Sequence, residues 1–183
     1  MKNSTARVVI AGLLMAALPS ALQAQRGTGS SGASQAVEVG VDGGFSFGLN
    51  TPSTVTFAIP FQNLRAAFPL NAKWSLEPSV GFNYFHVSGG SITALSLLVG
   101  APYTLNGATR HAGLYVRPFA GLTSASITGA PSQNSFILGG GIGYRMAATD
   151  RMSWRMEANF NHGFGGGDPS ALDLLFGLSF FTK

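Results

Sequence analysis

The chain has 183 residues, of which 45% are hydrophobic and only 10% are charged, against roughly 25% charged residues in an average soluble domain. The formal net charge of +4 is scattered without a basic cluster, so the pattern excludes a nucleic-acid-binding surface. Cysteine does not occur, which excludes disulfides, zinc–thiolate sites and cysteine nucleophiles.

The first 24 residues have the order of a secretory signal peptide. Lys2 and Arg7 form a basic start, Val8–Leu18 is apolar and uncharged, and small residues precede Gln25. The apolar run is shorter than the roughly 20 residues that a membrane-spanning helix needs, so cleavage after Ala24 is expected. Residues 25–36 are rich in Gly and Ser and are predicted to form a flexible leader. The remaining residues, 37–183, are predicted to form one domain.

From residue 37 onward the dominant pattern is alternation of apolar with polar or small residues, which is typical of β-strands. One predicted strand is irregular, because its apolar phase slips near Gln62 and Asn63. The slip indicates a bulge or, alternatively, a strand of which only Phe61–Leu70 lies in the membrane. The predicted strands are Val37–Asn50, Thr54–Leu70, Trp74–Val87, Ser91–Asn106, Gly113–Ser126, Ser135–Ala147, Met152–Phe164 and Ala171–Thr182.

These strands are long for a globular protein and suit a tilted crossing of a bilayer. Their number is even, as in bacterial transmembrane barrels. Short charged connections alternate with Gly/Ser-rich ones, so both chain ends are expected at the periplasmic side. The pattern therefore predicts an all-β, eight-stranded antiparallel up-and-down transmembrane β-barrel. A soluble secreted barrel or sandwich with its apolar face inside is the alternative.

The polar face of the predicted strands holds nearly all of their charges, with almost balanced signs. Charges away from water require partners, so we expect a paired network filling the lumen. Glu77 and Glu157 are expected to pair with Arg117 and Arg145. Five aromatic residues near strand ends on the apolar face, Trp74, Tyr84, Tyr103, Tyr144 and Trp154, suit interfacial girdles. The predicted lumen residues are Glu38, Asp42, Arg65, Glu77, Arg117, Arg145, Arg155, Glu157 and Asp173.

Three segments carry a resemblance to a known family. Asn71–Phe82 (NAKWSLEPSVGF), Tyr115–Leu122 (YVRPFAGL) and Gly139–Tyr144 (GGGIGY) resemble the strands of small OmpA/OmpX-type outer-membrane barrels, over about Val37–Lys183. The resemblance implies a place in the bacterial outer membrane, contact with lipid and lipopolysaccharide, insertion by the barrel-assembly machinery, a monomeric state and no cofactor. Members end in an aromatic residue, whereas here Thr182 and Lys183 follow the final phenylalanines.

Few residues suggest chemistry, and the sequence predicts no catalytic and no metal site. His86 and Ser88 share a strand face and could support acyl transfer, in a pattern resembling the His-x-Ser pair of lipid A deacylases, but no outward carboxylate is placed to orient the histidine. His162 and Asp168 flank a glycine run that lacks the lysine of a phosphate loop. His111, in a charged turn, is expected to be solvated.

The expected function is a structural one in the outer membrane, for a barrel filled by its own charges. A narrow or gated porin-like channel for small solutes is the alternative. A lipid A deacylase-type enzyme would need a complete catalytic set. An adhesin would need long outer loops, and the Gly/Ser-rich connections are short.

Overall fold

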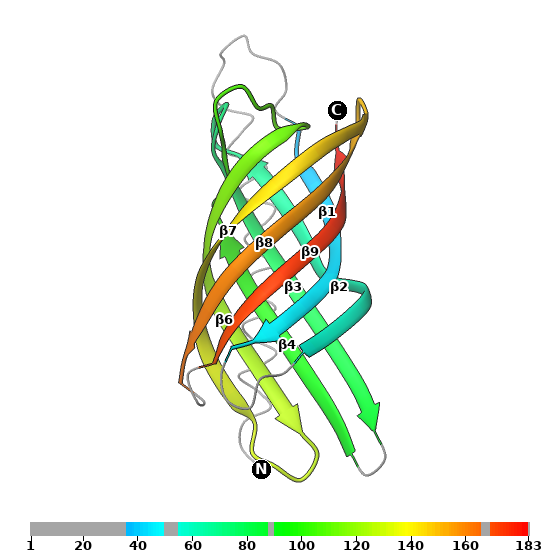
Figure 1. Ribbon diagram of the computed structural model, residues 1–183, viewed down its shortest axis with the longest axis vertical. Helices are drawn as coiled ribbons and strands as arrows, with labels where there is room; N and C mark the ends of the chain where they lie inside the picture. The colour runs from blue at the N-terminus through cyan, green and yellow to red at the C-terminus, as the bar shows by residue number, and fades with distance from the viewer. Residues whose placement is uncertain (1–35, 50–54, 88–89, 166–168, 183) are drawn as a thin grey trace. The chain divides into compact units, whose positions relative to one another are not determined.

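The computed structural model describes residues 36–49, 55–87, 90–165 and 169–182. The predicted signal peptide and the leader up to residue 35 lie outside the described residues. Within the described part of the chain, no helix is long and apolar enough to cross a membrane. The described residues form strands joined by short connections, as the alternation predicted (Figure 1).

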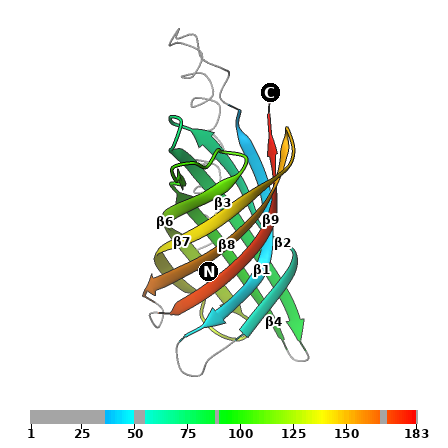
Figure 2. The same cartoon turned by 45° about the horizontal axis from the view of Figure 1, so that its top comes forward.

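The strands form one antiparallel sheet in the order β4-β3-β2-β1-β9-β8-β7-β6-β5, and a further pairing of β4 with β6 closes it into a ring (Figure 2). From β1 to β4 and from β5 to β9, each strand pairs with the next one in the sequence, and β1 pairs with β9. The strands are β1 (Glu38–Gly48), β2 (Val55–Pro69), β3 (Ser75–Val87), β4 (Gly90–Gly100), β5 (Tyr103–Thr104), β6 (Gly113–Ile127), β7 (Gln133–Thr149), β8 (Met152–Phe164) and β9 (Ser170–Phe181).

The ring has eight positions, because β4 and β5 are two parts of one predicted strand. Gly100 pairs with Phe119 and Tyr103 pairs with Val116, so the register against β6 does not change across the break. Pro102 lies at the interruption, and proline has no N–H to donate to the ladder. The predicted eight-stranded barrel is therefore confirmed, with one strand broken at a proline.

The predicted irregularity in the second strand is confirmed. Asp42 pairs with Asn63 and Gly44 pairs with Ala58, so the register shifts between these pairs. The described pairing of β2 with β3 runs from Pro69 to Asn63.

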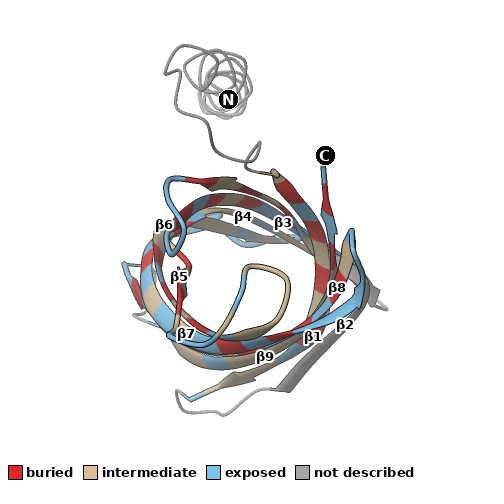
Figure 3. Cartoon of the chain, turned by 90° about the horizontal axis from the view of Figure 1, so that it is seen from above, coloured by how far each residue is buried: buried red, intermediate tan, exposed pale blue. Residues whose placement is uncertain are grey.

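The outer surface of the ring is apolar. Buried and exposed residues alternate along the strands (Figure 3), and outward side chains such as Leu64 (60% exposed) and Phe82 (58% exposed) have no protein to cover them. Trp74, Tyr84 and Trp154 are also exposed, as expected for girdle residues. A barrel that presents this surface requires hydrocarbon around it, which excludes the soluble alternative.

The two ends of the barrel differ. The terminal end carries the start of β1, the end of β9 and the turns after β2, β5 and β7, whereas the loop end carries the other four connections (Figure 1). Those four connections span only two to six residues each. The predicted split between charged turns and Gly/Ser-rich connections therefore corresponds to the two ends.

Candidate functional site

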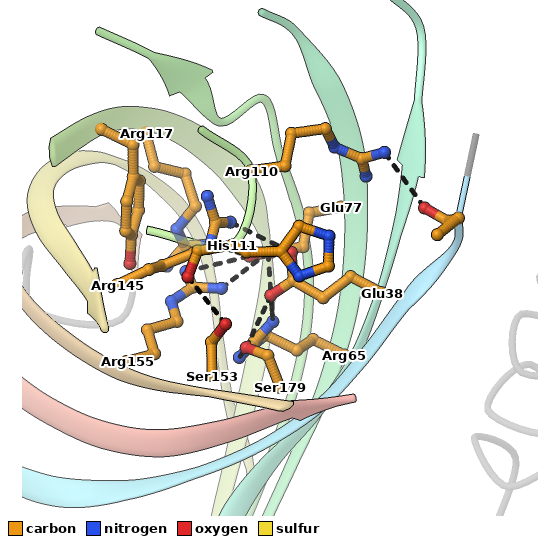
Figure 4. A network of polar contacts seen from close by, with 12 residues as sticks. Glu38, Arg65, Glu77, Arg110, His111, Arg117, Arg145, Ser153, Arg155 and Ser179 are labelled. Carbon is orange, nitrogen blue, oxygen red and sulfur yellow. Dashed lines mark hydrogen bonds and ion pairs between the residues drawn. The ribbon is translucent and has the colours of Figure 1, made fainter. Parts of the chain in front are cut away.

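A cluster of eight charged side chains crosses the interior of the barrel in its terminal half. Figure 4 labels Glu38, Arg65, Glu77, Arg117, Arg145 and Arg155 of this cluster. Each side chain is almost fully buried and points inward from a strand whose outward neighbours are apolar. Four carboxylates face four guanidinium groups, so the formal charges of the cluster cancel. The members of this charge network are Glu38, Asp42, Arg65, Glu77, Arg117, Arg145, Arg155 and Glu157.

Glu77 on β3 lies at the centre of the network and is 0% exposed. Arg155 Nη1 donates to its Oε2 at 2.7 Å, and Arg155 Nη2 donates to its Oε1 at 3.2 Å. Arg65 lies 3.6 Å away and Arg117 lies 3.5 Å away. One carboxylate thus links guanidinium groups from three other strands, which ties opposite walls of the barrel together.

Glu157 on β8 forms the second centre. Arg117 donates to Glu157 Oε1 through Nε at 2.9 Å and through Nη2 at 2.7 Å. The Tyr115 hydroxyl donates to Oε2 at 2.5 Å, and Arg155 also donates to that oxygen. Because both of its oxygens accept from charged or hydroxyl donors, the buried carboxylate is well compensated.

Arg145 and Arg155 face each other directly across β7 and β8, an arrangement that is normally destabilising. The ring of Tyr115 contacts both, with centroid distances of 4.3 Å to Arg145 and 5.0 Å to Arg155. The π face attracts each cation. Arg145 then pairs with Glu38 at 3.2 Å, not with Glu77 or Glu157. The pairing predicted for Arg145 is wrong, because the register places it nearest the first strand's carboxylate.

Arg65 joins the network to the seam between the first and last strands. Its Nε donates to Asp42 at 2.8 Å and its Nη1 donates to Glu38 at 2.5 Å. Its Nη2 donates to the Ser179 hydroxyl at 2.7 Å, which in turn donates to Glu38 at 2.7 Å. The guanidinium lies against Gly40, where a Cβ would come within 2.3 Å of its Cζ. The glycine therefore makes room for the arginine.

Residues 105–112, which join β5 to β6, form a turn across the terminal mouth of the barrel. The His111 carbonyl accepts from the Ser153 hydroxyl of β8 at 2.7 Å, and Arg110 donates to the Ala36 carbonyl at 3.0 Å. The His111 ring lies 3.8 Å from the ring of Phe181 on β9. Since β5 and β9 lie on different sides of the ring, this capping turn covers the network from the terminal end.

His111 is half-buried, so the expectation that it is solvated is wrong. Its Nδ1 is buried without a hydrogen-bond partner, since the histidine packs on Phe181. Burial, and next the positive charge of Arg110, hold the pKa of His111 below its ordinary value of 6.5. The carboxylate of Glu38 raises the pKa, Arg145 adds to the lowering, and Asp150 raises it.

Acidification is expected to loosen the capping turn. The folded state binds the His111 proton less tightly than the unfolded state, so the stability that neutral His111 contributes is complete above pH 6.5 and is lost as the pH falls toward the folded pKa. An NMR titration of the His111 ring in the refolded barrel should give a pKa below 6.5, together with a shift of the Phe181 ring signals. A measured His111 pKa at or above 6.5 would contradict the packing of the ring on Phe181. As a control, His111→Gln should abolish the pH-dependent shift of the Phe181 signals.

Asp173 does not join the network predicted for it. It lies on β9 six residues before Ser179, toward the loop end. Asn161 donates to its Oδ2 at 2.7 Å. Among the described residues no ion pair reaches it. Asp173 instead lines a cavity of about 320 Å³ on the loop side of the network.

The other candidate residues do not form a site in the described part of the chain. His86 belongs to β3, and Ser88 lies outside the described residues. The His162 Nδ1 is 2.8 Å from the Ser170 hydroxyl, and Asp168 lies outside the described residues. The described residues contain no group of three or more His, Cys, Asp or Glu side chains that could hold a metal ion.

Several inward residues were not anticipated from the sequence. Phe119 and Ile137 are buried in the lumen, although the apolar residues were assigned to the outer face. The strand alternation could have identified them as inward-facing, because Phe119 lies two residues after Arg117 and Ile137 lies two residues before Gly139. The capping turn had no such signal, since its contacts come from strands distant in sequence.

Comparison with known proteins shows which solved structures share this fold. No family model and no curated protein matches the chain. The structure of Neisserial surface protein A matches with a TM-score of 0.65 and 16% identity, over 79% of this chain and 96% of that one. Ail, the attachment invasion locus protein of Yersinia pestis, matches with a TM-score of 0.53 and 16% identity, over 81% and 100%. The N-terminal β-barrel domain of Pseudomonas aeruginosa OprF matches with a TM-score of 0.50 and 16% identity, over 80% and 98%.

At these identities the likeness is one of fold. The closed ring, the apolar outer surface and the polar interior define a bacterial outer-membrane β-barrel. This is the fold class and the location that the strand pattern predicted.

Proposed function

We propose that this protein is a small OmpA/OmpX-type barrel with a structural role in the outer membrane, its lumen sealed by the charge network and the capping turn. The observation that carries the proposal is Glu77, which is wholly buried and contacts three arginines from three other strands. Cross-lumen ties of this kind stiffen the barrel and obstruct a continuous water path. Its partners are then lipid, lipopolysaccharide and, during insertion, the barrel-assembly machinery.

The seal is tested by single-channel recording in planar bilayers. The refolded wild-type barrel should be silent at moderate voltage, whereas Glu77→Ala and Arg117→Ala should conduct, because each variant removes side-chain volume and leaves charged partners free to move. Asp150→Ala, which removes an exposed carboxylate in the turn after β7, is the matched control and should stay silent. Steady conductance of the wild type would overturn the sealed lumen.

A gated passage for small solutes is the second candidate. Arg155 contacts both Glu77 and Glu157, and Arg117 contacts the same two carboxylates. The two arginines can therefore exchange carboxylate partners without leaving a charge unpaired. Such an exchange is a physical route to opening a path through the lumen. Brief, voltage-dependent openings of the wild type, lost in a Glu157→Gln variant, would favour this candidate.

The remaining alternatives have less support. The name of Ail refers to attachment, but the connections at the loop end here span two to six residues, which leaves little surface for an adhesin. A lipid A deacylase would need His86 and Ser88 to act with an orienting carboxylate. A His86→Ala variant tests it directly: if the wild type deacylated lipid A and this variant did not, the structural proposal would fail.

A further inference from the structure

The loop-side cavity has walls of two kinds. Its floor is the charge network, through Arg65 and Arg117, and its volume is about 320 Å³, at the lower end of the range for ligand pockets. One wall, from β4, β6 and β7, presents Leu98, Phe119 and Ile137. Ser96 and Thr123 also lie on this wall, and the opposite wall is the more polar one, although Phe45, Ala171 and Leu175 belong to it.

The polar wall is made by β1, β8 and β9, through Ser46, Asn159, Asn161 and Asp173. Asp173 is the only carboxylate among the described lining residues that lacks an ion pair, because Asp42 and Glu77 are both held by Arg65. Asn161 and Ser46 each supply a side-chain hydrogen bond to Asp173, and a carboxylate has about four acceptor positions. The wall therefore retains acceptor capacity and a net negative charge.

The apolar wall requires an explanation of its own. Phe119 and Ile137 are 5% and 7% exposed and, with Leu98, face inward beside a charged network. The ring of Phe119 packs on the guanidinium of the floor residue Arg117, whose Cζ lies 4.7 Å from the ring centroid, and Ile137 on the neighbouring strand extends this apolar surface. Apolar groups that face a charged group across a small cavity are the arrangement found where a ligand has an apolar body and a polar head.

We propose that this cavity is a binding site for small organic cations, with an ammonium group at Asp173 and an apolar body against Phe119 and Ile137. The paired floor offers an anion no free cation, whereas Asp173 offers an ammonium group a charge-assisted hydrogen bond. This site is independent of whether the network conducts, because it lies on the loop side of the network.

Binding is tested by calorimetry and NMR with the refolded chain in detergent micelles, using benzylammonium as the probe. Benzyl alcohol and benzoate, which keep the ring and change the head group, are the matched probes, and empty micelles correct for partition. Wild type should bind benzylammonium at least about tenfold more tightly than benzyl alcohol, since a charge-assisted hydrogen bond contributes at least that factor. Equal binding of the three probes, or no binding, would overturn the proposal.

Two variants test whether the ligand binds at Asp173. Asp173→Asn keeps an acceptor for Asn161 and should fold, while weakening benzylammonium binding roughly tenfold or more without changing benzyl alcohol binding. Asp150→Asn changes the net charge equally at an exposed turn and should bind like wild type. Chemical-shift changes should centre on β9 around Asp173. An equal loss in both variants would mean that only net charge matters, and the proposal would be wrong.

Discussion

Replacing Glu77 with alanine will lower the free energy of unfolding by about 3–5 kcal/mol, the range observed when one partner of a buried ion pair is removed. Glu77 is wholly buried and contacts Arg65, Arg117 and Arg155. Its removal leaves the four arginines of the network with three carboxylates, so one buried positive charge is unpaired. Arg155 loses the most, because two of its hydrogen bonds go to Glu77.

The measurement is equilibrium unfolding by denaturant of the barrel refolded in lipid vesicles. Glu77→Gln keeps the volume and one acceptor, so its loss should be smaller than that of the alanine variant. In the double variant Glu77→Ala/Arg155→Ala the two losses should not add, because the second substitution removes a charge that the first left unpaired. A Glu77→Ala variant within about 0.5 kcal/mol of wild type, as is usual for surface substitutions, would show that the network contributes nothing to stability.

The architecture follows from the sequence because one physical rule decides it. A strand in a closed barrel has one face in lipid and one in the lumen, so alternation such as Val39-Gly40-Val41-Asp42 fixes which residues are inside. The slip near Asn63 was readable for the same reason, since an extra residue changes the phase.

The pairings inside the lumen could not be predicted in the same way. Alternation tells that Arg145 points inward, but its partner depends on strand register and stagger, which set its height in the barrel. Glu38 is 107 residues away in sequence and comes close only because the ring closes. Asp173 has the same inward phase as the network residues and yet lies at another height, beside Asn161.

The capping turn was missed for a different reason. Residues 105–112 have the composition of an exposed connection, and nothing local indicates that Arg110 reaches Ala36 or that His111 packs on Phe181. Such contacts depend on the diameter of the barrel mouth, which is a property of the whole ring.

The glycine run of β7 gives the second large expected effect: Gly143→Ala will destabilise the barrel, whereas Gly140→Ala will not. A Cβ at Gly143 would lie 2.2 Å from the Tyr115 hydroxyl, and Tyr115 is 0% exposed. Tyr115 cannot move away freely, because it donates to Glu157 and lies against two arginines. A Cβ at Gly140, on the outward face, would meet only the Arg117 carbonyl, at 3.9 Å.

Overpacking of this kind costs about 1–3 kcal/mol, and here the loss of the Tyr115–Glu157 hydrogen bond adds to it. Denaturant unfolding of the two variants in vesicles, beside wild type, measures the difference. Gly140→Ala should equal or slightly exceed wild type, because alanine loses less backbone freedom than glycine on folding. Both substitutions add the same methyl group to the same strand. Similar losses of unfolding free energy would therefore mean that replacing a glycine in β7 is destabilising whichever face it is on. A loss confined to Gly143→Ala would place it in the lumen, where the space beside that glycine is taken by the ring that separates Arg145 from Arg155.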